Sequence, residues 1–125
     1  MITDTLSNLF SKIKNGYLAK KSKIIHQTSK QNINILNIFL KEGFIKSYKI
    51  NSKTQLDIYL KYKKNKAVIS EIKRLSKPGK RLYIANSELY KKKSGFYILS
   101  TPLGLLTNLQ AKKLNVGGEL ICKIF

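Results

Sequence analysis

The sequence predicts an α+β protein made of two small α/β domains. The first part of the chain reads helix, strand, helix, strand, strand, because apolar stripes with helical spacing alternate with strand-like runs. The rest is mostly strand-like and holds one short helix near its end. Residues 63–66 read Lys-Lys-Asn-Lys and contain no apolar residue, so they mark the division. We therefore expect an N-terminal domain at residues 1–65 and a C-terminal domain at residues 66–125.

The first helix is expected to run from Thr3 or Asp4 to Gly16. Either of the first two residues can cap the helix N-terminus, and glycine is typical of a helix end. The apolar positions recur at helical spacing on one face and are Leu6, Leu9, Phe10 and Ile13. A short strand is expected next, over residues 23–27.

A second helix is expected to start at Thr28 or Ser29 and to close at Gly43. Its predicted apolar side consists of Ile33, Leu36, Phe39 and Leu40. The following residues read as a hairpin, with a strand over residues 44–50, turn residues at 51–53 and an alternating return strand over 56–62.

The second part of the chain is predicted to be strand-rich, with strands at residues 67–73, 80–85, 95–99 and 119–125. Residues 77–80 read Lys-Pro-Gly-Lys and predict a turn between the first two strands. The polar stretch 86–93 is expected to be irregular or a single helical turn. A short helix is expected between Thr107 and Leu114, with Thr107 as its cap.

The charge of the chain points to a polyanionic partner. Its 125 residues include 25 Lys or Arg against six Asp or Glu, which gives a formal net charge of +19. Self-repulsion at this level weakens the isolated fold, and a polyanion removes that penalty. Nucleic acid is the leading candidate. An anionic membrane surface is the competitor, but both helices need their apolar faces for a core, and no segment approaches the roughly 20 apolar residues of a spanning helix.

Cysteine usage and the N-terminus bear on the compartment. The single cysteine, Cys122, cannot form an intrachain disulfide and indicates a reducing compartment. Residues 1–4 carry an acid and no basic stretch, so neither a signal peptide nor an import sequence is expected. Arg74 and Arg81 stand among basic residues that are otherwise all lysine, and Ile and Asn are abundant. This usage indicates an AT-rich genome, either bacterial or an organelle's own.

Catalysis finds little support in the sequence. A single histidine, His26, offers no pair of base and orienting group, and we expect it to be structural or solvent-facing. The six carboxylates are scattered, without a close pair for acid–base work or metal-ligand spacing. No glycine-rich phosphate loop occurs. We expect no enzyme, no metal and no cofactor.

Two turns near the C-terminus are the most informative candidate binding features. Ser100-Thr101-Pro102-Leu103-Gly104 follows the apolar run 96–99, and Gly117-Gly118-Glu119 precedes the run 120–125. Hydroxyls, bare backbone and one acid are thereby presented at strand ends. Folded RNA offers the matching sugar hydroxyls, base edges and phosphates. The alternative is that these are ordinary turns in a basic protein.

Lysines and tyrosines are densest together in residues 59–64 and 77–83. Lysine neutralises phosphates, and tyrosine stacks on bases or donates to ribose. The alternative is that the lysines are only solvated and the tyrosines pack on strands. Glu119 is an unusual acid for a phosphate-facing surface. Either it accepts from a base amine or a ribose hydroxyl, or it pairs with Lys112 or Lys113.

Several blocks of the chain match one family, in order and over essentially the whole length. Residues 3–6 with 13–15 resemble its opening helix, and residues 29–30 with 40–45 resemble its second helix and exit. Residues 60–62 and 72–83 resemble the entry to its second domain. The more specific blocks are the last two, Ser100-Thr101 with Gly104, and residues 111–119 ending in Gly-Gly-Glu. The chain resembles the ribosomal protein S-eight (S8) family, a universal component of the small ribosomal subunit.

The resemblance implies two small α/β domains and a non-enzymatic role in the ribosome. A member of this family binds directly to a helix in the central domain of small-subunit rRNA, supports assembly and translation, and lies near ribosomal proteins S-five, S-twelve and S-seventeen. For localisation we expect the ribosome of a mitochondrial matrix, encoded by the organelle, with bacterial cytoplasm or plastid as alternatives. A general RNA-binding protein outside the ribosome is the alternative function.

The resemblance also assigns RNA contacts to residues of this chain. They are Lys61, Lys77, Pro78, Gly79, Lys80, Arg81, Tyr83, Ser100, Thr101, Pro102, Gly104, Gly117, Gly118 and Glu119. The family usually carries a third hydroxyl and a basic residue where Pro102 and Leu103 stand here. One hydrogen bond and one phosphate contact are therefore missing, and Pro102 is expected to stiffen the loop instead.

Overall fold

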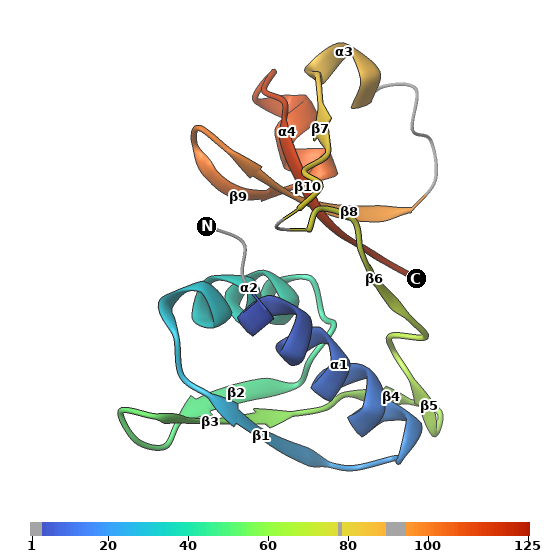
Figure 1. Cartoon of the computed structure of the whole chain (residues 1–125). Coiled ribbons are helices and arrows are strands. Elements are labelled where there is room, and N and C mark those ends of the chain that lie inside the picture. Colours follow the sequence, from blue (N-terminus) through green and yellow to red (C-terminus); the bar gives the residue numbers. More distant parts are fainter. Residues whose placement is uncertain (1–3, 78, 90–94) are drawn as a thin grey trace. The chain divides into compact units, whose positions relative to one another are not determined.

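The computed structural model describes the backbone of residues 4–77, 79–89 and 95–125, which divide into two compact units, residues 4–70 and residues 71–125 (Figure 1). The first unit reads helix, strand, helix and then strands, and the second is built around a sheet. The predicted α+β class and element order are therefore confirmed.

The first unit consists of a three-stranded antiparallel sheet with two helices on the same side of it (Figure 1). Strand β3 is central and pairs with β1 and β2, and a small hairpin of β4 and β5 follows. The elements are α1 (Asp4–Leu18), β1 (Lys23–Gln27), α2 (Lys30–Lys41), β2 (Ser47–Ile50), β3 (Gln55–Tyr59), β4 (Tyr62–Lys63) and β5 (Lys66–Ala67).

Helix α1 runs two residues past Gly16, so the predicted stop at this glycine is wrong. A Cβ at Gly16 would lie 2.7 Å from Cγ2 of Ile24 and 2.9 Å from Cδ1 of Leu60, so the glycine lets the helix approach the strands closely. The helix ends at Leu18, and Lys20 terminates it by adopting a left-handed φ of 55°. The N–H of Lys20 donates to the Tyr17 carbonyl at 3.1 Å and that of Lys21 donates to the Gly16 carbonyl at 2.9 Å. These two bonds form a Schellman motif.

Helix α2 begins as predicted, because Ser29 is its N-cap and accepts from the backbone N–H of Asn32 at 3.1 Å. Gly43 follows the helix with a φ of +81°. The predicted apolar side is partly wrong, since Ile35 is buried and Leu40 is exposed. Phe39 sets the rotation of the helix through ring contacts with α1 and with the segment that leaves α2.

The second unit is a five-stranded antiparallel sheet in which β10 is central. It pairs with β6 and β7 on one side and with β8 on the other, and β9 forms the outer hairpin with β8. Its core cluster consists of Ile84, Tyr97, Leu99, Ala111 and Leu120. The elements are β6 (Ile72–Arg74), β7 (Tyr83–Ile84), α3 (Asn86–Leu89), β8 (Phe96–Thr101), β9 (Gly104–Thr107), α4 (Asn108–Lys113) and β10 (Gly118–Ile124).

The predicted strand at residues 67–73 is wrong in extent, because β5 and β6 are separate and belong to different compact units. The strand predicted over 80–85 shrinks to Tyr83–Ile84, and β9 was not predicted. Helix α4 is capped by Thr107 as expected, through a capping box with Gln110. No helix in the described ranges is long and apolar enough to cross a membrane.

Candidate nucleic-acid interface

Three strands of the second unit bring predicted site residues into one row. Glu119 on β10 pairs with Tyr83 on β7 and with Ser100 on β8. Residues paired across antiparallel strands share a face, and successive residues alternate between faces. The row therefore lies on the face opposite to Leu120 and Leu99, which belong to the core cluster. Tyr83 is 68% exposed at one end of the row.

Gly117 and Gly118 allow the strands to meet at this row. A Cβ at Gly118 would lie 2.2 Å from the Ser100 carbonyl oxygen and 3.1 Å from Cα of Thr101. A Cβ at Gly117 would lie 2.3 Å from the Ile84 carbonyl oxygen. Backbone occupies these positions, so no side chain fits without moving a strand. The two glycines are thus required for packing, whatever else they contact.

The predicted loop at residues 100–104 is the tight turn of the β8–β9 hairpin. Thr101 pairs with Gly104, which has a φ of +110°. The Thr101 hydroxyl donates to the Gly104 carbonyl oxygen at 2.8 Å and its oxygen accepts from the Leu103 N–H at 3.1 Å. Pro102 and Leu103 are exposed at the tip. The departures from the family pattern therefore stand at the exposed tip of the turn.

The segment between β6 and β7 forms a second tip. Lys77 and Lys80 exchange two backbone hydrogen bonds, at 2.9 and 3.0 Å, so the expected turn is present. Lys77, Gly79, Lys80 and Arg81 are exposed, and Pro78 lies outside the described residues. The buried Ser76 anchors the base of the turn, because its hydroxyl oxygen accepts from the Leu82 N–H at 2.9 Å. Sequence reasoning did not place Ser76 in the site, and only its position before Lys-Pro-Gly signals it.

Glu119 forms an ion pair with Arg81, in place of the pairing with Lys112 or Lys113 that was one of two alternatives. The distance from Arg81 Nη1 to Glu119 Oε1 is 3.3 Å. Glu119 is only 7% exposed, while about a third of the Arg81 side chain stays exposed. Oε2 of Glu119 is buried and has no hydrogen-bond partner among the described residues. The carboxylate therefore holds the guanidinium of Arg81, which directly follows the Lys77–Lys80 turn.

Lys61 belongs to the first unit, whereas the row and the two tips belong to the second. It is an exposed residue of the first unit, after β3, and its backbone N–H donates to the Tyr17 hydroxyl at 3.2 Å. The row and the two tips are built only from residues 71–125.

Little in the described ranges suggests catalysis. They contain no group of three or more His, Cys, Asp or Glu residues that could hold a metal ion. His26 is buried on β1, so the expectation that it is structural or solvent-facing resolves to the structural alternative.

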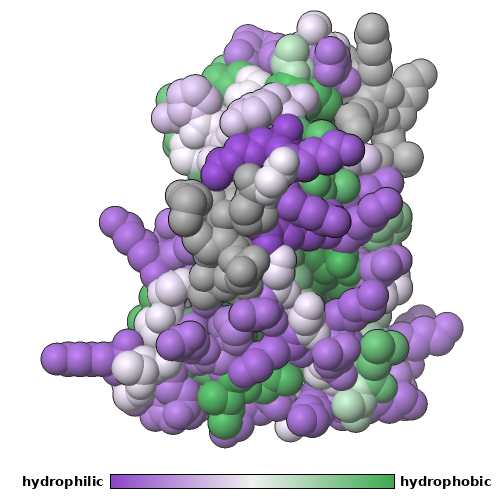
Figure 2. Space-filling model, viewed as in Figure 1, coloured by the Kyte–Doolittle hydropathy of each residue, from purple (hydrophilic) through white to green (hydrophobic). Residues whose placement is uncertain are grey.

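Hydrophilic residues cover most of the visible face, with smaller apolar patches between them (Figure 2). This arrangement suits a polar, anionic partner.

Comparison with known proteins gives a full-length match. The family described as "Ribosomal protein S8" matches residues 4–125. The small ribosomal subunit protein uS8 of Rickettsia typhi is 42% identical over 130 residues, which cover 99% of this chain and 98% of the relative. The proteins of the same name from Rickettsia canadensis and Rickettsia felis match with the same identity and coverage.

Proposed function

Because the chain belongs to the Ribosomal protein S8 family, we propose that it binds directly to a helix in the central domain of small-subunit rRNA and supports assembly and translation. As a member of that family it is a small ribosomal subunit protein and not an enzyme. The observation that carries the proposal is the convergence of three distant segments, residues 77–83, 100–104 and 117–119, at one end of the β10 sheet.

In the proposed mode of binding, the two tips and the row contact different groups of the RNA. Lys77, Lys80 and Arg81 neutralise phosphates. The hydroxyls of Tyr83, Ser100 and Thr101, with the backbone at Gly104 and at Gly117-Gly118, meet riboses and base edges. Side chains do not enter the deep groove of regular A-form RNA, so a distorted helix with an accessible minor groove is the target. Pro102 stiffens the turn of the β8–β9 hairpin, and Lys61 adds a phosphate contact from the first unit.

The ion pair with Arg81 determines the proposed role of Glu119. A carboxylate on an RNA-facing surface repels phosphates unless its charge is compensated. Here Arg81 compensates it at 3.3 Å, and the carboxylate in return orients the guanidinium. Glu119 acts through Arg81 in this proposal, and Arg81 meets the RNA.

Thr101→Ala is the sharpest single test of the interface. It removes the hydroxyl of the half-buried Thr101, which bonds within the turn. Thr54→Ala in the β2–β3 turn is the control because the Thr54 hydroxyl also bonds within its own turn. We expect Thr101→Ala to weaken binding of the central-domain rRNA fragment by about fivefold or more and Thr54→Ala to leave it unchanged. Equal effects would count against a localised site. Gly118→Lys is a poor test, since its side chain would displace β8.

Competition separates this function from that of a general RNA-binding protein. A protein that recognises one rRNA helix prefers the central-domain fragment over random RNA of equal length at about 0.15 M salt. A general binder shows equal affinity for both RNAs, and its binding falls with salt for both in parallel. Preference for the fragment, lost in Thr101→Ala, is the expected result.

Three finer points belong to the proposal. The neighbours are proteins of the S-five, S-twelve and S-seventeen types, which cross-linking of intact subunits tests. The proposed location is a mitochondrial ribosome. The lysine-rich composition supports an organelle's own genome, while the compared relatives are bacterial. Finding the gene in a mitochondrial genome would support this location, and finding it in a bacterial genome would contradict it. The domains are residues 1–65 and 66–125, and limited proteolysis of the full chain locates the boundary.

A further inference from the structure

The first unit carries two lysine-rich turns that lie together. One is the end of α1, with Lys20 and Lys21, and the other is the β4–β5 hairpin, with Lys63, Lys64 and Lys66. All of these lysines are exposed. We call Lys20, Lys21, Lys63, Lys64 and Lys66 the lysine cluster. It belongs to the first unit, whereas the candidate interface is built from residues 71–125.

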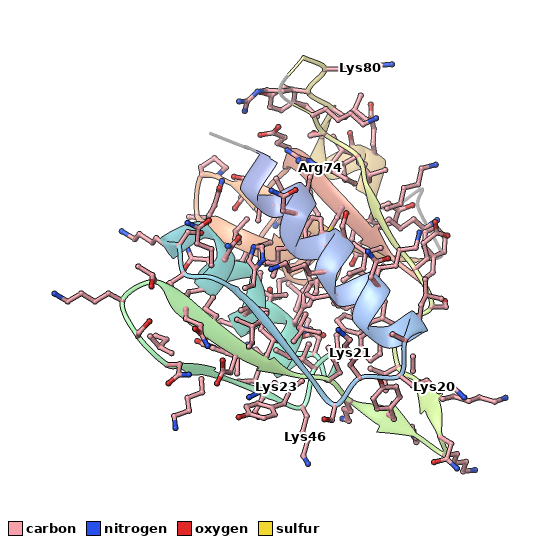
Figure 3. All side chains as sticks on the ribbon, turned by 60° about the horizontal axis from the view of Figure 1, so that its bottom comes forward. Lys20, Lys21, Lys23, Lys46, Arg74 and Lys80 are labelled. Carbon is pink, nitrogen blue, oxygen red and sulfur yellow. The ribbon has the colours of Figure 1, made fainter. Side chains whose placement is uncertain are left out.

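Specific contacts hold the two turns next to each other. The Tyr62 hydroxyl on β4 donates to the Lys21 carbonyl oxygen at 2.6 Å, and the Tyr62 ring packs edge-on against Tyr17 of α1 with 5.4 Å between centroids. Lys20 and Asn65, one from each turn, line the same open pocket of about 420 Å³ together with Tyr62. Figure 3 shows Lys20 beside the β4–β5 hairpin. The cluster is therefore a fixed feature of the fold.

The lysines stand at positions that disfavour them. Lys20 and Lys64 have φ values of 55° and 53°, in the left-handed region where glycine is most easily accommodated. Lys63 lies directly opposite Lys66 in the hairpin register, and like charges in that position repel. With the described residues none of the lysine cluster forms an ion pair.

The helix dipole accounts for part of the pattern only. A lysine near the C-terminus of α1 interacts favourably with the partial negative charge there. This explanation covers Lys20 and Lys21, but it does not reach the hairpin lysines. Two acids of the same unit stand at other places: Asp57 lies 4.0 Å from Nζ of Lys23, and Glu42 is the C-cap residue of α2. An external polyanion is the partner that would relieve the charge repulsion in both turns.

We propose that the lysine cluster binds the phosphate backbone of a second segment of small-subunit rRNA, separate from the segment held by residues 77–83 and 100–104. This rests on the proposed function only in taking rRNA as the partner. RNA fits better than an acidic protein, because the cluster offers five exposed lysines beside an open pocket, and lysine neutralises phosphates as a point charge. Asn65 and the lysine ammonium groups supply the donors that contact phosphates there.

The first test combines stability with RNA binding. In the double variant Lys20→Gly/Lys64→Gly both left-handed positions receive the residue that suits them, so unfolding in urea should occur at an equal or higher concentration. Its affinity for small-subunit rRNA should fall at least about fivefold at 0.15 M salt, with a salt slope lower by roughly 1.4 to 1.8. Lys30→Gln/Lys53→Gln, at exposed sites of the same unit, should change the affinity less than about twofold. Equal losses in both variants, or no loss in the first, would overturn the proposal.

The second test locates the contact in intact small subunits. Because the native Cys122 is buried, a hydroxyl-radical probe can be attached selectively at Lys64→Cys or Leu103→Cys. We expect rRNA cleavage from both positions, at different nucleotides. Cleavage from position 103 alone, or from both at the same nucleotides, overturns this proposal. Cleavage from position 64 alone supports the lysine cluster and counts against the interface of the proposed function.

Discussion

Ser76 and Leu82 are joined by two hydrogen bonds through a single buried hydroxyl. The Ser76 oxygen accepts from the Leu82 N–H at 2.9 Å, and its hydrogen is donated to the Leu82 carbonyl at 3.2 Å. The same carbonyl accepts from the Leu120 N–H at 2.8 Å. This arrangement closes the base of the Lys77–Lys80 turn against β10, so a residue with no exposed surface determines where exposed lysines stand.

Replacing Ser76 with alanine should therefore affect both folding and RNA binding. The change leaves the Leu82 N–H without its acceptor, which lowers the free energy of unfolding by about 1 to 3 kcal/mol. The rRNA fragment should also bind several-fold more weakly, because the turn loses its anchor. Urea unfolding and equilibrium binding measure the two effects. Ser87→Ala, at an exposed serine of α3, is the control. A stability loss with unchanged RNA affinity would remove the turn from the interface.

The two glycines at positions 118 and 79 should respond oppositely to alanine. Gly118→Ala places a Cβ 2.2 Å from the Ser100 carbonyl oxygen, so β8 and β10 must separate and the protein should lose about 2 to 4 kcal/mol. Gly79→Ala meets nothing within 4 Å and should change stability by less than about 1 kcal/mol. Thermal or urea unfolding compares them. Similar losses at both positions would refute the packing role of Gly118.

The ion pair between Arg81 and Glu119 should be detectable by a double-mutant cycle. Glu119→Gln keeps the side-chain size, Arg81→Gln shortens the side chain, and each removes one charge. We expect a coupling energy of about 0.5 to 1.5 kcal/mol in urea unfolding. For the rRNA fragment, Arg81→Gln should weaken binding, and Glu119→Gln should weaken it less because the arginine remains. A Glu119→Gln defect that persists in the Arg81→Gln background would indicate a direct contact of Glu119 with RNA.

The thiol of Cys122 should be unreactive and should make stability depend on alkaline pH. Burial raises the pKa of Cys122 from 9.0 to about 12, and the nearby Arg74 partly opposes the rise. Since the folded pKa exceeds the unfolded one, the stabilising contribution is complete below about pH 9 and is lost as pH rises towards 12, by up to about 2 to 4 kcal/mol.

Comparison with Cys122→Ala isolates the contribution of this thiol. The control is needed because burial also raises the pKa of Tyr17 above its ordinary value. The variant should lose less stability than the native chain between pH 9 and pH 11. Alkylation of the native protein at pH 8 should be far slower than alkylation in urea. Rapid alkylation under native conditions would contradict the buried position of the sulfur.

Local signals made the helices predictable. Ser29 and Thr107 cap their helices through hydrogen bonds to residues three positions on, and such bonds need no information from elsewhere in the chain. The same reasoning failed at Gly16, because a glycine at a helix end and a glycine under a crossing strand look alike in sequence. Only the positions of Ile24 and Leu60 distinguish the two.

The candidate site was predictable in its segments and not in its contacts. Turn residues and the family resemblance pointed to residues 77–83, 100–104 and 117–119. The Arg81–Glu119 pair joins residues 38 positions apart, and it follows from the pairing of β7 with β10, which no local pattern specifies. Strand β9 was missed for the same reason, since Leu105 and Leu106 form a strand only by pairing with β8.

The close contact of β10 with β8 at Gly118 limits how this protein can be redesigned. Because backbone fills the position a side chain would take, altered RNA preference cannot be engineered there without rebuilding the sheet. Lys77, Lys80, Pro102 and Leu103 at the two tips are exposed and tolerate exchange, whereas the φ of +110° at Gly104 favours glycine. A library aimed at new RNA targets should therefore randomise the tips and keep the glycines fixed.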